Sequence, residues 1–348
     1  MVNSSQVDYW IDSCQDYKHS WLGGFLLTAL GGQCQLHWWP NSVTDFKLIK
    51  SGDVVVLNDE SFMTTSTADL IKIVNLTPEV IIITSNELRY NELLNYNFKK
   101  SIFFPYDHWF LNIIGLRKLG TNIKKEPGNR VFNFLNRRWS PGRLHTIEHI
   151  FRYHPELLDT GYVTAGTFDY YKDHPKIQTD NEFLNFYHAG QSVIENNNFF
   201  IDGMPITSNT KNFIHLAQYI PGLISIQIET FSDCEEFNLL LTEKSMIAIA
   251  TGQIPIIIGK EPYILKRYLK DQGFDIYDDI VDQSYDFETG YFRRCELAIE
   301  LNLDYLNGCN QLPNLTERAN YNQNHLLTTW CNQILLNLVN RIYQLCLN

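Results

Sequence analysis

The sequence lacks the features that mark secreted, membrane-spanning and dinucleotide-binding proteins. Its seven cysteines include no CxxC pair, which indicates neither a disulfide framework nor a zinc site. No apolar run reaches about 18 residues, the length that a membrane span needs, because Glu243, Lys244 and Gln253 interrupt the longest candidate, residues 239–259. The N-terminal residues contain no basic region followed by an apolar run, and no GxGxxG pattern occurs. We therefore expect a soluble cytoplasmic protein with no membrane span, and not a nicotinamide or flavin enzyme.

The sequence also has fewer basic than acidic residues. The 348 residues include 28 Lys and Arg against 39 Asp and Glu, a formal net charge of −11. This balance provides no general attraction to nucleic acid or to an anionic membrane. Hydrophobic residues make up 44% and charged residues 19%, as in ordinary globular proteins, and the length is sufficient for two domains.

Short β-branched runs alternate with helical patterns, which predicts an α/β protein with parallel strands. The first third contains three predicted strands and a helical pattern: Asp53–Leu57, Val80–Thr84, Lys100–Phe104 and, for the helix, Thr67–Val74. The polar segment 120–129, with two glycines and a proline, follows them. We interpret residues 1–122 as an N-terminal Rossmann-like domain and segment 120–129 as a linker.

A second α/β block begins with a predicted strand at residues 130–135 and covers residues 130–310. Its further strands are predicted at residues 223–228 and 254–258, and residues 178–208 are predicted to form a long surface excursion. A C-terminal region, residues 318–348, is predicted to be one long helix from about Asn322, which either stays with the second domain or crosses back to the first.

Two strand-to-helix junctions of the second block contain residues suited to an anion. In the first, Arg137, Arg138 and Arg143 surround a helix start at which Ser140 is the expected N-cap and Pro141 the first helical residue. Guanidinium groups bind phosphate oxygens in a bidentate manner, so this cluster indicates anion binding. A solvated basic turn explains it equally well.

The second junction contains Glu229 at a strand end and Thr242, Glu243 and Lys244 at a helix start. Thr242 is the expected N-cap, and Glu243 suits the positive end of the helix dipole without any ligand. Lys244 is locally unfavourable there unless an anion binds, and Glu229 ends an otherwise apolar strand. In an open parallel sheet, ligands bind where such strands end.

These segments resemble the donor-binding region of the fucosyltransferase family, in which a strand ending in Phe-Glu-Asn precedes a Val-Thr-Glu-Lys helix start and an Ala-Gly-x-x-Pro-Val strand. Here they read Ser225–Glu229, Leu241–Ser245 and Ala250–Gly259. The chain is still more similar to glycosyltransferase-like proteins of phages and cyanobacteria, which share the segment Gly273–Asp286. The resemblance covers roughly residues 130–300, with the motifs in the expected order.

The resemblance implies a GT-B glycosyltransferase: two facing Rossmann-like domains, the donor in the C-terminal one, the acceptor mostly on the N-terminal one, and no essential metal. It implies that Glu243 holds the ribose and Lys244 the diphosphate. Arg143 or Arg138 would hold a phosphate, and Glu229 would lie near the transferred sugar.

An inverting transferase also needs a base that takes the proton of the acceptor. The resemblance does not place this base, which we expect in the N-terminal domain. The candidates follow predicted strands: Asp59 and Glu60, Glu87, and Asp107 with His108. Glu87, which follows Thr84-Ser-Asn at the end of the strand 80–84, is slightly favoured.

Two further patterns have ordinary explanations. The segment His37–Pro40, His-Trp-Trp-Pro, would suit sugar stacking, but a packed aromatic corner explains it better. His145 and His149 have a spacing that suits a metal, yet without a third ligand we interpret them as surface or interdomain residues.

The sequence thus predicts a glycosyltransferase that uses a nucleoside diphosphate sugar, with GDP-sugars favoured, as a co-substrate and no other cofactor. The chain differs from the family pattern at Leu240 and Thr230, so the sugar is not predicted, and the acceptor is a glycan, a small molecule, a protein or modified DNA. One alternative is a phage-type enzyme that glycosylates modified DNA bases, with the basic stretch 117–125 facing DNA. The other is a catalytically silent module that binds a sugar or nucleotide.

Overall fold

The structure, a computed structural model, describes residues 3–15, 21–31, 35–39, 49–57, 71, 74–75, 77–110, 113–119, 130–136, 140–164, 222–229, 241–310 and 312–347. The chain divides into two compact units. Unit 1 comprises Met1–Thr121, Glu235–Glu243 and His325–Asn348, and unit 2 comprises Asn122–Cys234 and Lys244–Asn324. Each unit contains a parallel four-stranded sheet, so the α/β class is confirmed, and we describe each by itself.

The sheet of unit 1 has the order β1-β2-β3-β4, with every neighbouring pair parallel. Its strands are β1 (Leu36–Trp39), β2 (Val54–Leu57), β3 (Ile81–Thr84) and β4 (Ser101–Phe103). The Val-Val-Val-Leu and Ile-Ile-Ile-Thr runs are buried throughout, as expected for strands covered on both faces. The strand β1 was missed, because the segment 37–40 was interpreted as an aromatic corner.

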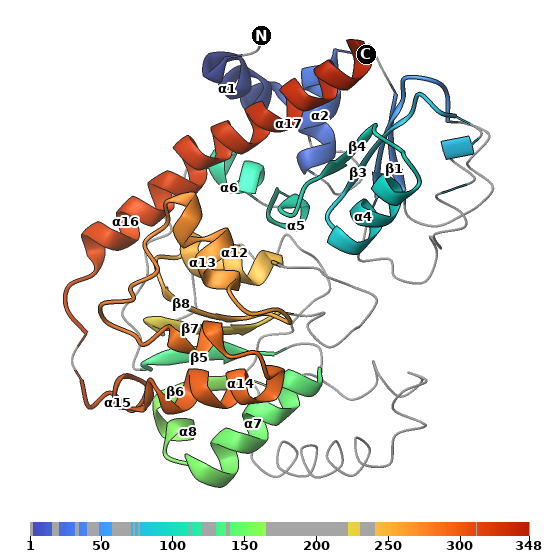
Figure 1. Ribbon diagram of the computed structural model, residues 1–348. Helices are drawn as coiled ribbons and strands as arrows, with labels where there is room; N and C mark the ends of the chain where they lie inside the picture. Colours follow the sequence, from blue (N-terminus) through green and yellow to red (C-terminus); the bar gives the residue numbers. More distant parts are fainter. Residues whose placement is uncertain are drawn as a thin grey trace. The chain divides into compact units, whose positions relative to one another are not determined.

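The helices of unit 1 form two groups. Helix α4 (Glu87–Asn95) packs on β3 and β4, whereas α1 (Ser4–Ser13), α2 (Trp21–Leu30), α6 (Ile113–Leu119) and α17 (Trp330–Leu347) pack on one another (Figure 1). Trp330 of α17 lies against Tyr106 and against Trp109 and Phe110 of α5 (Asp107–Phe110), with ring centroids 5.0–5.7 Å away. Residues far apart in the sequence therefore share one aromatic core.

The sheet of unit 2 has the order β6-β5-β7-β8 and is also parallel. Its strands are β5 (Phe132–Leu135), β6 (Gly161–Thr164), β7 (Ile224–Ile228) and β8 (Ile254–Ile258). The sequence predicted all of them except β6, which is short and begins with a glycine. Gly161 is required there, because an added Cβ would lie 2.1 Å from the ring of Phe132.

Helices cover both faces of this sheet. In Figure 1, α12 (Glu243–Ala250) and α13 (Ile264–Tyr268) lie on one face, and α7 (Pro141–Tyr153) and α14 (Tyr291–Glu300) on the other. The remaining elements are short helices or connect the sheet to the C-terminal region: α8 (Leu157–Thr160), α15 (Leu303–Leu306), α16 (Thr316–Asn324) and the 3-10 turns η3 (Lys270–Gln272) and η4 (Ser284–Phe287).

The C-terminal helical region differs from the prediction of one helix from Asn322. Helix α16 begins earlier, at Thr316, and a π-helical turn, η5 (His325–Thr329), separates it from α17. The polar composition of α16 hid its start, because the apolar stripe that the prediction followed begins only at Leu326. The segments 120–129 and 178–208, and most of 67–74, lie outside the described residues, although the unit boundary after Thr121 falls within 120–129.

Candidate functional site

The carboxyl edge of the unit 2 sheet contains a topological switch point between β5 and β7. The chain leaves β5 for β6 on one side and then returns to β7 and β8 on the other. The described pairing of β5 with β7 runs over Phe132↔Ile224 and Asn133↔Ser225, at the amino ends of both strands. Open α/β sheets bind their ligands at the carboxyl end of such a switch point.

Arg143 lies at this switch point and is 1% exposed. It is in the first turn of α7, where Ser140 caps the helix by accepting a hydrogen bond from the Arg143 N–H at 3.4 Å, as predicted. The guanidinium Nε and Nη2 donate to the carbonyl of Ile228 at 3.1 and 2.7 Å. Because the N–H of Glu229 donates to Ile258 of β8 and a peptide plane is trans, the Ile228 carbonyl faces β5. Arg143 therefore satisfies a carbonyl on the side of β7 that faces β5.

Glu229, the residue directly after β7, is 1% exposed. Its carboxylate accepts a hydrogen bond from the hydroxyl of Ser245, a fully buried residue in the first turn of α12. A buried carboxylate is tolerated only with such partners, and the positive end of a helix dipole stabilises it further. The end of β7 is thus connected to the start of α12 as well as to the start of α7.

The predicted helix start after the second junction lies where the sequence placed it. Helix α12 begins at Glu243 and directly follows the buried Thr242, and Lys244, its second residue, is half-buried. The side chain of Glu243 lies outside the described residues, as do all of Arg137 and Arg138. The ligand-binding roles of these residues stay predictions.

Arg294 is a buried charge at the same edge that sequence reasoning missed. It is fully buried, and its guanidinium donates to the carbonyls of Gly259 at 2.7 Å, Lys260 at 3.0 Å and Glu288 at 2.8 Å. Burial lowers the pKa of this guanidinium. The helical pattern contained a signal for its burial, because Arg294 lies on the apolar face of α14, one turn before Ala298.

Asp286 is a second buried charge at this edge and is 2% exposed. Its carboxylate accepts hydrogen bonds from the backbone N–H of Ile264 at 3.0 Å and of Lys266 at 3.3 Å, at the start of α13. Burial raises the pKa of the Asp286 carboxyl to about 6. Arg294 and Asp286 together hold the loop that follows β8.

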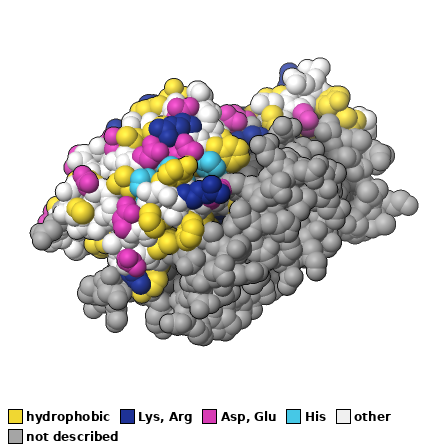
Figure 2. Space-filling view, turned by 90° about the horizontal axis from the view of Figure 1, so that it is seen from below, with side chains coloured by type: hydrophobic (Ala, Val, Ile, Leu, Met, Phe, Trp, Pro, Cys, Tyr) yellow, Lys and Arg dark blue, Asp and Glu magenta, His cyan; other side chains and the backbone are white. Residues whose placement is uncertain are grey.

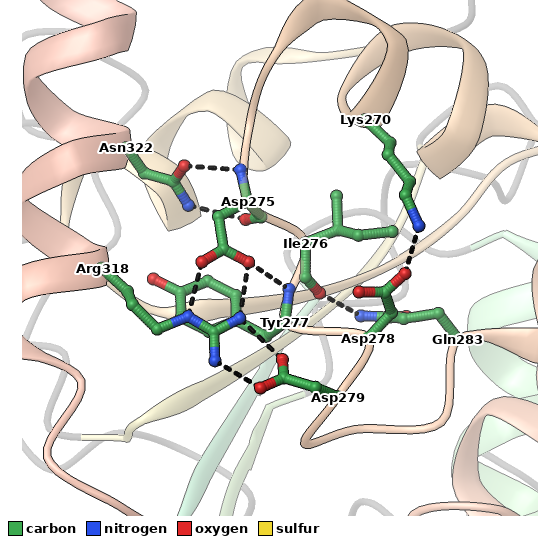
Figure 3. Close-up of polar contacts among 9 residues, drawn as sticks. All are labelled: Lys270, Asp275, Ile276, Tyr277, Asp278, Asp279, Gln283, Arg318 and Asn322. Atoms are coloured by element: carbon green, nitrogen blue, oxygen red, sulfur yellow. Dashed lines mark hydrogen bonds and ion pairs between the residues drawn. The ribbon is translucent and has the colours of Figure 1, made fainter.

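The shared segment Gly273–Asp286 lies against α16 (Figure 3). Arg318 of α16 lies between two carboxylates of this segment, donating to Asp275 Oδ1 at 2.6 Å and to Asp279 Oδ1 at 2.7 Å. Asn322, one turn later, accepts from the N–H of Asp275 and donates to its carbonyl. Among the described residues, the acidic side chains of this segment therefore form hydrogen bonds and ion pairs within the chain.

The candidate bases of the N-terminal domain are described only in part. Glu87 begins α4 after β3 and is half-buried, next to Asn86, which caps the helix by accepting from the N–H of Leu88 and Arg89. Asp107 begins α5, but its side chain and that of His108 lie outside the described residues, as do Asp59 and Glu60 entirely. Glu87 thus occupies the predicted carboxyl edge, and its role as a base stays a prediction.

The two histidines of α7 pack against α14, and only His149 is buried. His149 is 7% exposed, and both histidines lie against α14, where His145 Nε2 is 2.9 Å from Glu296 and His149 Nε2 is 3.4 Å from Glu300. Burial lowers the pKa of His149. Figure 2 shows histidines among acidic and basic side chains on the face seen from below, over α7 and α14 in Figure 1. The interpretation as a surface or interdomain residue was wrong for His149, which is buried against α14, whereas His145 is 25% exposed. The i, i+4 spacing of the two histidines matches that of Glu296 and Glu300 on the facing helix.

Comparisons of the chain with protein-family models, with curated proteins and with solved structures found no match. In the described part of the chain, no helix has the length and apolarity needed to cross a bilayer. Within the same residues, no group of three or more His, Cys, Asp or Glu side chains is arranged to hold a metal ion.

Proposed function

We propose that the chain is a glycosyltransferase of the GT-B type that takes a sugar from a nucleoside diphosphate sugar, with GDP-sugars as the favoured donors. The proposal includes an inverting reaction without an essential metal ion. Its acceptor is a glycan, a small molecule, a protein or modified DNA.

One observation carries the donor half of the proposal. Two successive residues at the end of β7 are bonded to the first turns of two different helices: Ile228 to Arg143 of α7, and Glu229 to Ser245 of α12. Two helix N-termini are thus fixed at the carboxyl end of one strand, next to the switch point. Backbone N–H groups and helix dipoles at such an edge favour a diphosphate.

The side chains at this edge have complementary tasks in the proposed reaction. Lys244, in the first turn of α12, would neutralise the diphosphate as the glycosidic bond to the sugar breaks. Arg143 donates two hydrogen bonds to the Ile228 carbonyl and so would hold the start of α7 at the end of β7, with its positive charge next to the proposed diphosphate. Glu229 and Ser245 keep the start of α12 at the end of β7, which fixes the position of Lys244.

Isothermal titration calorimetry with GDP tests the donor site. We expect Lys244→Ala to weaken binding about 10-fold or more, because a hydrogen bond to a charged group contributes roughly 1.5–3 kcal/mol. Glu243→Ala should also weaken binding, through the lost ribose contact. Lys266→Ala is the matched control, since this lysine is 55% exposed and pairs with Asp271.

If neither Glu243→Ala nor Lys244→Ala changes the affinity for a nucleoside diphosphate that the wild type binds, the proposed donor site is wrong. Slow hydrolysis of a nucleotide sugar in water, without an acceptor, would separate an enzyme from a silent binding module. Tight binding without turnover across a panel of donors would favour the silent module.

A further inference from the structure

Tyr263, in the loop after β8, has a strained backbone that its own packing does not explain. Its φ is +65°, a left-handed conformation that is unfavourable for a bulky side chain, yet the side chain is 48% exposed. Tyr277 has a similar φ of +59° but is fully buried, with the guanidinium of Arg318 4.6 Å from its ring centroid. Burial offsets the strain at Tyr277 and does not do so at Tyr263. Strain that packing does not repay is typical of ligand-binding positions.

The loop that carries Tyr263 is held on both sides by the two buried charges. Arg294 binds the carbonyls of Gly259 and Lys260, which precede Tyr263. The backbone carbonyl of Asp286 accepts from the N–H of Tyr263 at 2.7 Å, while its carboxylate binds the N–H groups that follow. The loop around Tyr263 is therefore held by hydrogen bonds from the helix α14 and the 3-10 turn η4.

A second exposed ring lies beside the first and depends on the same anchor. Phe287, directly after Asp286, is 52% exposed, and its ring centroid is 5.4 Å from that of Tyr263, with the ring planes 54° apart. The two half-exposed rings in contact form a small apolar patch, which is the kind of surface that a planar apolar ligand face can cover.

The two rings belong to the same edge of the sheet as the proposed donor site. Ile258, the last residue of β8, pairs with Ile228 of β7, so the loop after β8 begins next to Glu229. Neighbouring strands lie about 4.8 Å apart, which places the start of this loop about 10 Å from β5, across β7. In a nucleoside diphosphate the ribose separates the base from the diphosphate, so a base would lie one or two strands away from the switch point.

We propose that Tyr263 and Phe287 form a stacking platform for the nucleobase of the donor. This inference rests on the proposed function and adds the residues that hold the base. The ligand is a planar heteroaromatic ring, whose π-face would stack on one ring while its edge contacts the other, since the two ring planes are 54° apart. Arg294 and Asp286 are positioning residues, since they hold the loop and not the ligand.

Calorimetry with two probes, GDP and inorganic diphosphate, tests the platform. We expect Tyr263→Ala and Phe287→Ala each to weaken GDP binding about 10-fold or more, because stacking on one aromatic ring contributes enough for a loss of that order. Neither change should alter binding of inorganic diphosphate. Tyr153→Ala is the control: Tyr153 is 67% exposed and lies at the other end of α7.

Tyr263→Gly separates loss of the ring from loss of the loop. Glycine adopts the left-handed conformation without strain, so the melting temperature should be unchanged or raised while GDP binding weakens as in Tyr263→Ala. If the wild type binds GDP and all three platform variants bind it equally well, the platform is wrong and the donor site stands. If the wild type binds neither probe, the proposed function fails and the platform with it.

Discussion

Three buried charged residues at the carboxyl edge of unit 2 act mainly on the backbone. Arg143 binds the Ile228 carbonyl, Arg294 binds carbonyls of the next loop, and Asp286 binds N–H groups at the start of α13. Arg143 bonds one backbone carbonyl, and Arg294 and Asp286 each bond two or more backbone groups near the end of a strand or the start of a helix. The charges therefore fix the shape of the edge, whatever ligand binds to it.

Asp286 makes the stability of unit 2 depend on pH. Burial raises the pKa of its carboxyl from 3.8 to about 6, so the folded state binds its proton more tightly than the unfolded state. Its contribution to stability is complete below about pH 4 and is lost as the pH rises through about 6. One pKa unit corresponds to about 1.4 kcal/mol, which gives a change of roughly 3 kcal/mol.

Asp286→Asn removes this titration. Between about pH 4 and pH 7, we expect the free energy of unfolding of the wild type to fall by up to about 3 kcal/mol relative to that of the variant. Urea denaturation at several pH values measures this difference, and the comparison cancels other titrating groups. Parallel pH profiles for the two proteins would contradict the prediction.

Residues with a local signature were predictable, and those defined by tertiary contacts were not. Ser140 and Pro141 at the start of α7 follow from N-cap and first-turn preferences. Arg143 was identified as important, but the carbonyl that it binds is 85 positions away along the chain. Arg294 was missed because an arginine on a helix usually indicates the solvent face.

At the scale of the elements, the segment Gly273–Asp286 and α16 stabilise each other through side-chain contacts. Arg318 bridges Asp275 and Asp279, and its guanidinium also lies over the ring of Tyr277. These contacts raise the pKa of Arg318 through hydrogen bonds to both carboxylates and keep it charged. The network connects positions about 40 residues apart, so it constrains the fold more than a pair within one helix does.

Arg318→Ala should therefore destabilise the protein more than a matched variant. We expect a loss of about 1–3 kcal/mol in the free energy of unfolding, since charge-assisted bidentate pairs exceed exposed ion pairs. Arg293→Ala is the control: Arg293 also binds two carboxylates, Glu296 and Glu300, but within α14 and with its side chain 48% exposed. Equal losses in denaturant titrations of the two variants would contradict this interpretation.

The strands β2, β3, β4, β5, β7 and β8 were predicted to within one or two residues. The failures have physical causes. The strand β1 contains two adjacent tryptophans before a proline, a pattern that was interpreted as an aromatic corner and not as a strand. The strand β6 is short and begins with a glycine. The π-helical turn η5 has no signature in the sequence, because it inserts an irregularity into a continuous helical pattern.

At the scale of the whole molecule, the charge of −11 opposes the reading in which the acceptor is DNA. The basic stretch 117–125 begins with Arg117, which pairs with Asp8 and donates to Asn332 within unit 1. One of its cations is therefore already used by the protein, and the other residues of the stretch after 119 lie outside the described part.

We expect weak binding of duplex DNA at about 150 mM salt, with a shallow dependence of log K on log salt concentration. Fluorescence anisotropy with a labelled duplex measures both quantities. The double variant Lys124→Ala/Lys125→Ala should leave them unchanged. Tight binding with a steep salt dependence that this variant reduces would revive the DNA-modifying alternative.

The organisation into two parallel sheets was predictable from the alternation of strands and helices, whereas the sequence left open whether the C-terminal helix crosses back to the first domain. Unit 1 takes its residues from three separate segments, and the last of them, His325–Asn348, contains α17. The packing of Trp330 and the hydrogen bonds of Asn332 to Asp8 and of Tyr343 to the Ala29 carbonyl show where that helix belongs.

This arrangement of α17 affects the order in which a growing polypeptide can fold. Ribosomes add about 5–20 residues per second, and a domain generally folds once all of its chain has emerged. The first segment of unit 1 is synthesised first, but α17 can join α1, α2 and α6 only after residues 122–324 have been synthesised. At that rate the delay is on the order of 10–40 s. During this delay α1 and α2 lack one of the helices that they pack on, so the nascent N-terminal segment is the part that would need a chaperone.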